Sequence, residues 1–352
     1  MRITRLDLRL FASGLLSLLQ AAAGLCGLVL TVDAAAKIGR ISGALSRGAE
    51  PSEVARYFLL ELPRLALVSL PVSLALACAF SVARFVRKRE HIVVLSGGIS
   101  LHRALAPLLA LGLLAAFSWF ALAEWVVPAA TLRRTALKAS LFARSDMFRD
   151  AVAVEKDGGE VRIFHLERLT RSDGGMRAEG FHCFIKRGGR NVEEVHAASA
   201  VWIPHSGRWR LSGAVAFVYD ESGFRRRTER EHLSSSLRFA DFRLGLSPSA
   251  LTLEGLAELE DDPLYAFHYY RRFGFPLALL ALAAVVTFLA PPRAESSLFM
   301  VLAAALAAAF GLYLADVAAS ALLPLLGPVP AACLPPGAAL AAAAVAALRL
   351  RT

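Results

Sequence analysis

The chain has 352 residues, 56% of them hydrophobic, and carries a formal net charge of +10. A soluble globular chain is roughly half apolar at most and rarely gathers its apolar residues into blocks of about 20, as this sequence does. This composition excludes an ordinary soluble enzyme. Because the excess cations flank the apolar blocks, we attribute them to membrane orientation and not to nucleic-acid binding.

Six apolar segments are long enough to cross a membrane, since a helix of about 20 residues spans the hydrocarbon core. The first follows Arg2, Arg5 and Arg9, as in a signal peptide, but it is too long for one and is predicted to be retained. The predicted spans are residues 10–32, 62–86, 104–127, 273–290, 298–319 and 332–348.

The short loops between these spans predict an orientation. Arginine and lysine gather before the first span, between the second and third, and after the last. With an even number of spans these places share one side, which the positive-inside rule makes the cytoplasm. Residues 33–61 and the long segment after the third span then lie outside. The pattern predicts a multi-pass protein of a bacterial inner membrane, with both termini cytoplasmic and a large periplasmic domain.

The cytoplasmic segment at residues 87–100 has the most informative pattern. Its first half is charged, and an apolar ridge follows from Ile92 to Leu95. Gly97 and Gly98 suit a helix end, because glycine tolerates a left-handed backbone. A short amphipathic helix here suits docking into a groove of a cytoplasmic protein. A helix that rests on lipid headgroups fits the same pattern.

Residues 129–270 are predicted to form a β domain. From Arg208 to Tyr219 apolar and more polar side chains alternate, which predicts one strand with one apolar face. Glycine-containing turns recur at short intervals, a spacing typical of an antiparallel sandwich, jelly roll or open barrel. Residues 248–262 are predicted to close the domain as a short helical linker capped by Ser249.

These elements predict three parts: a transmembrane half at residues 1–128, the β domain at 129–270, and a second transmembrane half at 271–352. The fold class is a membrane α-helical bundle with an inserted periplasmic all-β, jelly-roll-like domain. Asp316 lies near the outer end of the fifth span, where an acid is costly and usually paired or functional. Arg271 and Arg272 are its candidate partners.

The sequence holds no recognised motif for nucleotide binding or hydrolysis: G-x-x-x-x-G-K-[ST], H-E-x-x-H and G-x-S-x-G are all missing. His165, His182, His196 and His205 lack metal-ligand spacing and are expected to be ordinary surface or core histidines. The four cysteines include no C-x-x-C pair and are expected to be apolar fillers. We therefore expect no metal, cofactor or catalytic site in this chain.

Four short motifs occur along the chain in a recognisable order. They are Pro63 and Pro71 in the second span, residues 90–100 with Glu90, Val93, Gly98 and Ser100 in matching positions, Glu124-Trp125-Val126-Val127-Pro128, and Leu334-Pro335. In this order, with three spans before a β domain and three after it, they resemble the LptF/LptG (YjgP/YjgQ) family of lipopolysaccharide export permeases. The stretch Trp209-Arg210-Leu211 resembles the LptG branch.

The resemblance implies a permease subunit of an ABC-type exporter. Such a subunit pairs with a sister permease on a cytoplasmic LptB-like ATPase dimer, which binds the ATP. It works with an LptC-like single-span protein and a periplasmic LptA-like bridge. The complex extracts lipopolysaccharide from the outer leaflet of the inner membrane and passes it through β jelly rolls. Residues 87–100 would be the coupling helix, with Glu90, Val94, Leu95 and Gly98 meeting the ATPase.

The implied substrate carries phosphates and acyl chains, which call for cations and an apolar groove. The candidates are Lys37, Arg40, Arg271 and Arg272 for the phosphates, and Leu211, Val215 and Phe217 for the acyl chains. For each of them, a cation that anchors a span end or a residue of the sheet core is the alternative. The family often has a basic residue at the position of Leu30, so this departure leaves the phosphate contact open.

Two rival functions remain. A membrane scaffold could bind an envelope partner through the β domain, without transport. A lipid-modifying enzyme could use Glu124 or Asp316 as an acid or base, but it needs a nucleophile–base–orienter set that the sequence does not show. Co-purification of a nucleotide-hydrolysing subunit would separate a transporter from a scaffold.

Overall fold

The computed structural model divides the chain into two compact units. The helical unit comprises Met1–Ser42, Ala55–Arg133 and Pro248–Thr352, and the unit that contains the strands comprises Gly43–Val54 and Arg134–Ser247. The structure describes residues 5–46, 48–142, 147–157, 160–172, 175–187, 190–203, 206–219, 225–237, 243–244, 248–260 and 263–349.

Six helical segments within the described residues are long and apolar enough to cross a membrane, which confirms the predicted number of spans. They are Arg5–Ala36, Pro51–Arg87, Leu101–Thr135, Pro263–Ala290, Leu298–Ala321 and Pro328–Leu348. A helix suits this environment because it satisfies its backbone hydrogen bonds internally. The fourth span begins earlier than predicted, because its first turns are aromatic and basic, a composition typical of a membrane interface.

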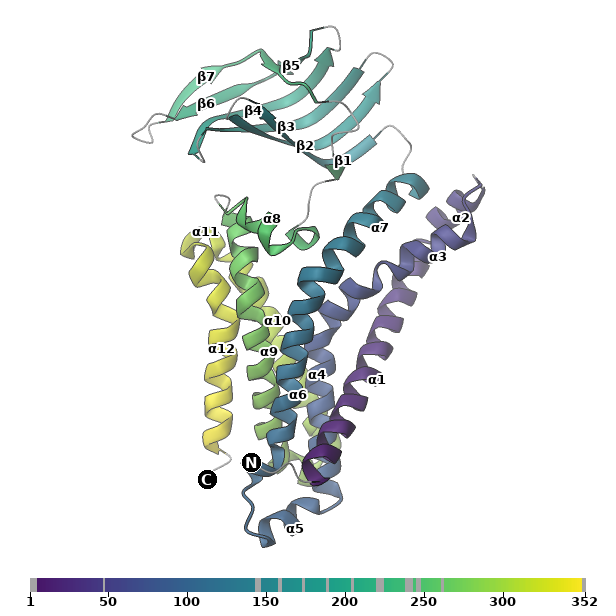
Figure 1. Ribbon diagram of the computed structural model, residues 1–352, viewed down its shortest axis with the longest axis vertical. Helices are drawn as coiled ribbons and strands as arrows, with labels where there is room; N and C mark the ends of the chain where they lie inside the picture. The colour runs from purple at the N-terminus through teal and green to yellow at the C-terminus, as the bar shows by residue number, and fades with distance from the viewer. Residues whose placement is uncertain are drawn as a thin grey trace. The chain divides into compact units, whose positions relative to one another are not determined.

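Figure 1 shows the long helices side by side in one bundle. They are α1 (Arg5–Ala36), α4 (Leu62–Arg87), α6 (Leu101–Ala121), α9 (Pro263–Ser296), α10 (Leu298–Ala321) and α12 (Pro328–Arg349). Shorter helices are α2 (Ile38–Ser46), α3 (Pro51–Leu59), α5 (Glu90–Ser96), α7 (Val127–Phe142), α8 (Leu253–Ala257) and α11 (Leu323–Leu326), and a π-helical turn, Leu122–Val126, follows α6. In the bundle, α5 lies at one end and α8 and α11 at the other (Figure 1).

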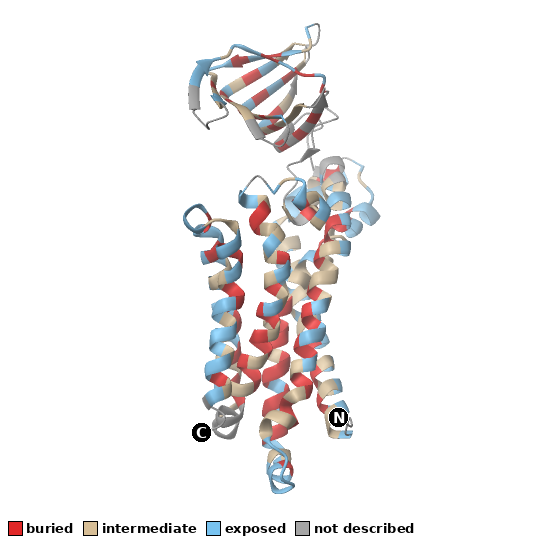
Figure 2. Cartoon of the chain, turned by 60° about the vertical axis from the view of Figure 1, so that its left-hand side comes forward, coloured by how far each residue is buried: buried red, intermediate tan, exposed pale blue. Residues whose placement is uncertain are grey.

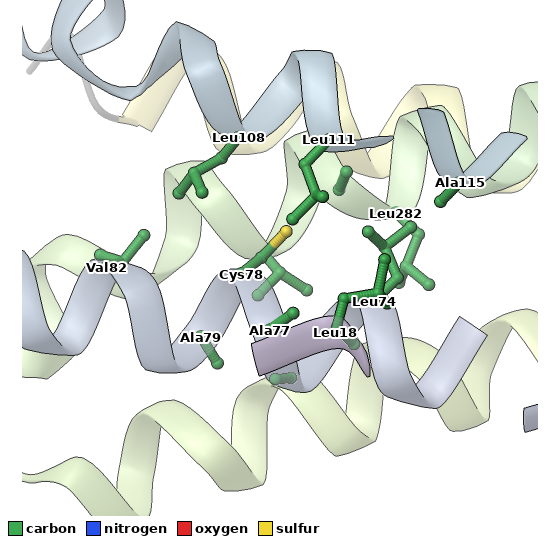
Figure 3. Close-up of a cluster of buried hydrophobic side chains, with 14 of the residues drawn as sticks. Leu18, Leu74, Ala77, Cys78, Ala79, Val82, Leu108, Leu111, Ala115 and Leu282 are labelled. Carbon is green, nitrogen blue, oxygen red and sulfur yellow. The ribbon is translucent and has the colours of Figure 1, made fainter. Parts of the chain in front are cut away.

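The core of the bundle is formed largely by α4, α6 and α9. Figure 3 shows Cys78 of α4 among Leu108 and Leu111 of α6 and Leu282 of α9. Gly112 allows α6 and α9 to approach closely, since a Cβ there would lie 2.6 Å from the Cβ of Ala283. Small residues at such contacts let membrane helices associate. By contrast, α1, α10 and α12 bury little of their apolar surface, as Figure 2 shows for the C-terminal helix.

Within the described ranges, the strands form a nine-stranded antiparallel sheet. They are β1 (Met147–Asp157), β2 (Glu160–Ser172), β3 (Gly175–Arg187), β4 (Arg190–Ile203), β5 (Arg208–Ser212), β6 (Val215–Tyr219), β7 (Arg225–Glu229), β8 (His232–Ser234) and β9 (Arg243–Leu244). The order is β7-β6-β4-β3-β2-β1-β9, and β5 pairs with both β4 and β8. A β domain inserted in a helical bundle is therefore confirmed.

A line of irregular positions crosses four strands of the sheet. It consists of positions without a register partner: Asp150 in β1, Glu167 in β2, Gly180 in β3 and Ala198 in β4, followed by Gly213 between β5 and β6. We call it the crease. Buried residues alternate on both sides of the crease, but in β3 they are odd-numbered after Gly180 and even-numbered before it. The two glycines have φ angles of 60° and 65°, which side chains of L-residues disfavour.

The predicted single strand from Arg208 to Tyr219 is wrong, because the crease passes through it. β5 and β6 are separate strands, and Gly213 lies between them in the left-handed conformation. Leu211 belongs to the buried cluster of the sheet, whereas Val215 and Phe217 are half-buried on the other face. These three residues therefore do not form one apolar surface.

The linker after the sheet is shorter than predicted and has a different cap. Pro248–Ala250 form a 3-10 turn that contains Ser249, because proline pre-sets the φ angle of a turn start. Thr252 is the N-cap of α8, and its hydroxyl accepts a hydrogen bond from the N–H of Gly255 at 3.4 Å. Among the described residues of the linker, the α-helical part is Leu253–Ala257.

Candidate functional site

α5 is a seven-residue helix flanked by two residues with positive φ angles. Arg89, immediately before it, has a φ of 57°, and Gly98, shortly after it, has a φ of 74°. Arg89 is the one described non-glycine residue with a positive φ. That conformation costs a non-glycine residue about 1–2 kcal/mol. The surrounding contacts therefore hold α5 in a defined orientation at the end of the bundle.

The apolar ridge of α5 has an inward and an outward part. Val94 is 8% exposed and packs in the bundle core. Ile92, Val93 and Leu95 are 52%, 72% and 51% exposed. Leu95 is therefore available to another protein. Val94, predicted as a second anchor for a partner, instead fastens α5 to its own bundle.

Two ion pairs join the first turns of α1 to the segment around α5. Asp7 accepts hydrogen bonds from both terminal nitrogens of Arg103, at 3.0 Å each, which is the strong bidentate arrangement. Glu90 lies 3.6 Å from Arg9, whose side chain is 64% exposed. Exposed pairs contribute at most about 1 kcal/mol. The Glu90 side chain is 25% exposed, so it is partly accessible, and its contact with Arg9 is weak.

At the other end of the bundle, Glu124 connects three helical elements. It lies in the π-helical turn, and both of its carboxylate oxygens accept hydrogen bonds from the N–H of Leu253 at 3.0 Å. It also pairs with Arg272 of α9, which is 5% exposed and donates to the carbonyl of Leu251. A carboxylate engaged in this way orients the linker and is not a free acid or base.

Asp316 of α10 pairs with Arg271 of α9 and not with Arg272. The Nε and Nη2 atoms of Arg271 donate to its two carboxylate oxygens, each at 2.6 Å. Arg271 also lies over the ring of Phe275, 4.9 Å from its centroid. The two neighbouring arginines thus have separate carboxylate partners within the chain. Either one would have to exchange its partner to bind a phosphate.

The remaining phosphate candidates differ in how available they are. Lys37 donates to Asp33 at 2.6 Å and lies 5.5 Å from the ring centroid of Tyr57. Arg40 is exposed in α2 and has no ion-pair partner among the described residues. Leu30 lies in α1 and contributes no charge. Of this set, Arg40 is the cation most accessible to an anionic ligand.

Three histidines face one another across the strands: His165 in β2, His182 in β3 and His196 in β4. The Nδ1 atoms of His182 and His196 are 2.6 Å apart, so one donates and the other accepts. Burial, and then the charge that His196 would carry, lower the pKa of His182, which favours the neutral ring. The ring of Phe217 lies 5.9 Å from that of His196. This row lies on the face opposite Leu211.

The described residues form exposed surfaces and ion pairs between helices, and they show no arrangement typical of a catalytic site. No group of three or more His, Cys, Asp or Glu among them is arranged as a metal site. Burial raises the pKa of the Cys183 thiol, which makes that cysteine unreactive. The contacts therefore suit docking, ion pairing and lipid packing.

Sequence reasoning missed the contact of Glu124 with the linker and the row of histidines. The first joins residues 129 positions apart, and only helix packing brings them together. The second had a usable signal. In an antiparallel hairpin the residues equidistant from the turn pair with each other. Asp173-Gly174 lies midway between His165 and His182. The pairing of His182 with His196 also depends on a one-residue register shift between Ile185 and Lys186, which the sequence does not show.

A comparison with protein families places these features in context. The model described as "Lipopolysaccharide export system permease LptF/LptG" matches residues 10–349. The matched range contains all six apolar helices except the first turn of α1, and it includes α5, Glu124 and the sheet. No curated protein matches the chain.

Proposed function

The chain belongs to the LptF/LptG family of lipopolysaccharide export system permeases, and on this basis we propose its role in transport. It is a permease component and not itself an enzyme. In our proposal it is one permease of an ABC-type exporter in a bacterial inner membrane. It extracts lipopolysaccharide from the outer leaflet and passes it through its periplasmic β domain towards the outer membrane.

Energy for this transport enters through α5 in our proposal. A cytoplasmic ATPase dimer, LptB-like, binds the ATP, so this chain itself needs no cofactor. The support is the geometry of α5, which presents exposed Leu95 and weakly paired Glu90 at one end of the bundle. Gly98, with its positive φ, ends the segment and returns the chain to α6.

A sister permease is proposed to cover the exposed apolar surface of the peripheral helices. Phe310, Leu314 and Val317 of α10 recur at the spacing of one helix face and are 65%, 59% and 63% exposed. An LptC-like single-span protein and a periplasmic LptA-like bridge complete the proposed assembly. Arg40 is the proposed first phosphate contact.

The observation that carries this proposal is the family match over residues 10–349. The test is reconstitution in proteoliposomes, measuring both co-purification of the ATPase and ATP-driven release of lipopolysaccharide. Leu95→Asp places a charge on the exposed ridge and is expected to reduce both readouts by about tenfold or more, as when an apolar anchor of an interface is lost. Ser96→Asp is the matched control, because it adds the same charge to the same helix and leaves the ridge intact.

The outcomes separate the alternatives. ATPase binding without ATP-driven lipid release would contradict transport and leave a scaffold. Equal losses in Leu95→Asp and Ser96→Asp would show that any added charge disturbs the segment, and the ridge would lose its assigned role. Wild-type release in both variants would exclude α5 as the point of coupling.

A further inference from the structure

A cavity of about 300 Å³ lies between α1 and α4, beside the start of α5. Arg9 is near the beginning of α1, and Arg84 is in the last turn of α4. Both residues are therefore at the end of their span that faces α5. Because span ends meet the headgroups of a bilayer, we assign the cavity to that depth, beside α5.

The polar part of the lining holds groups without strong partners. Arg84 is exposed and has no ion pair within the described ranges. Among the described residues, the one ion-pair partner of Arg9 is Glu90, at 3.6 Å, which is longer than a hydrogen bond. Ser81 is 3% exposed, and its Oγ is buried with no hydrogen-bond partner among the described residues. This hydroxyl lies beside Gly14, where α1 packs on α4, so it is enclosed by the bundle and does not open into the cavity.

The apolar part of the lining narrows the choice of ligand. Ala12 is exposed and Leu16 is 58% exposed, and both line the cavity on the α1 side. They continue into the exposed apolar surface of α1, on which Leu19 is 59% exposed. A small inorganic ion would make no use of that surface, whereas acyl chains would cover it.

We propose that this cavity binds the phosphate group of a membrane phospholipid from the leaflet on the α5 side. Arg84 and Arg9 supply guanidinium donors to the phosphate oxygens. The acyl chains lie along Ala12 and Leu16. The cavity is separate from the outer-side cations considered for the transported lipid.

The bound phosphate would also act on Glu90. A guanidinium that donates to a phosphate has fewer donors left for a carboxylate, so the ligand competes with Glu90 for Arg9. Occupancy therefore releases the Glu90 carboxylate towards the cytoplasmic side. This consequence rests on the proposed coupling role of α5, whereas the binding site itself does not.

The test is photolabelling of the purified full-length protein with a diazirine-bearing phosphatidylglycerol. A diacylglycerol with the same chains and the same diazirine serves as the phosphate-free probe. The wild type should be labelled on α1 and α4 by the phospholipid only. Arg84→Gln should lower labelling by about tenfold, as expected for one lost charge-assisted hydrogen bond. Arg84→Lys should keep most of it.

Two pairs of variants make the result specific to the cavity. Ala12→Phe fills the cavity from an exposed position and should also abolish labelling, while Ala23→Phe, exposed on the same helix outside the cavity, should not. Arg5→Gln removes an exposed cation from the same end of α1 and should leave labelling within about twofold, because it lies outside the lining.

Three results would overturn the proposal. Equal losses in Arg5→Gln and Arg84→Gln would mean that the cations attract lipid without a site. Equal labelling by the diacylglycerol probe would mean that the phosphate is not recognised. Displacement of the phospholipid by inorganic phosphate alone would assign the cavity to a free anion. ATP-driven lipid release is measured separately, so a failed labelling test leaves the proposed transport role standing.

Discussion

Glu124 and Arg272 lie 148 positions apart in the sequence and form an ion pair that also orients the start of α8. Arg272 is 5% exposed, so its charge has almost no access to water. Removing one partner of a buried pair leaves the other charge uncompensated, at a cost of about 3–5 kcal/mol. The position of the linker therefore depends on a single carboxylate.

We predict that Glu124→Ala lowers the free energy of unfolding of the full chain in detergent by about 3–5 kcal/mol. The measurement is thermal or denaturant unfolding followed by circular dichroism. Glu179→Ala is the control, because its pair with Arg168 is about half exposed and is worth at most about 1 kcal/mol. Adding Arg272→Gln to Glu124→Ala should restore part of the loss. A loss no larger than that of Glu179→Ala would contradict the role of the pair.

At the scale of secondary structure, the crease determines which residues of the sheet are buried. Gly180 is its most constrained position, because its φ is 60° and a Cβ would lie 2.4 Å from the side chain of Glu167. The Glu167 side chain is exposed and can move away. The left-handed backbone cannot be relieved in the same way. Backbone strain at a positive φ, and not the clash with Glu167, therefore sets most of the stability lost when Gly180 is substituted.

Gly180→Ala is predicted to lower the local stability of β2, β3 and β4 by about 1–2 kcal/mol. Hydrogen exchange of their amides in the full chain should become about 5–30 times faster, with no change in the amides of α9. Gly180→Asn should cost less, since asparagine tolerates the left-handed region better. Adding Glu167→Ala to Gly180→Ala should not recover the loss. Full recovery would show that the clash, and not the backbone, sets the cost.

At the scale of the whole molecule, the proposed orientation can be tested with single cysteines in a background that lacks Cys26, Cys78, Cys183 and Cys333. Ser46 and Ser206 are exposed in segments proposed to be periplasmic, and Ser96 is exposed at the end of α5. Cysteines at Ser46 and Ser206 should react with a membrane-impermeant thiol reagent in intact cells. A cysteine at Ser96 should react only after lysis. Labelling of that position in intact cells would reverse the assignment of the two sides.

The number of spans and their order around the β domain follow from the sequence, because the length of an apolar block is a local property. The ends of elements follow less well, and the start of α9 is the example. Its aromatic and basic first turns belong to the helix but not to the hydrophobic block. Hydropathy therefore placed the span start later than the structure does.

Features that depend on distant contacts could not be derived from local pattern. Val94 belongs to the same apolar ridge as Leu95, and only the packing of α5 against the bundle shows that it is buried. The face of Val215 depends on the backbone of Gly213, which alternation cannot reveal. The sequence leaves two candidate partners for Asp316, Arg271 and Arg272. Consecutive residues of a helix point in different directions, so the orientation of α9 decides that the partner is Arg271.

At the crease, the alternation of buried and exposed side chains shifts at matching positions in four neighbouring strands. Side chains alternate between the two faces of a sheet with a period of two. A deletion or insertion of one residue therefore moves every later side chain of that strand to the opposite face. In this sheet the alternation already shifts once, at positions that face one another in neighbouring strands. A one-residue insertion or deletion at Gly180 or Gly213 would cancel that shift in one strand. The apolar side chains of that strand would then lie on the opposite face from those of its neighbours. Insertions and deletions in this sheet should therefore be confined to the turns between strands, because a change of length there leaves the faces of the strands unchanged.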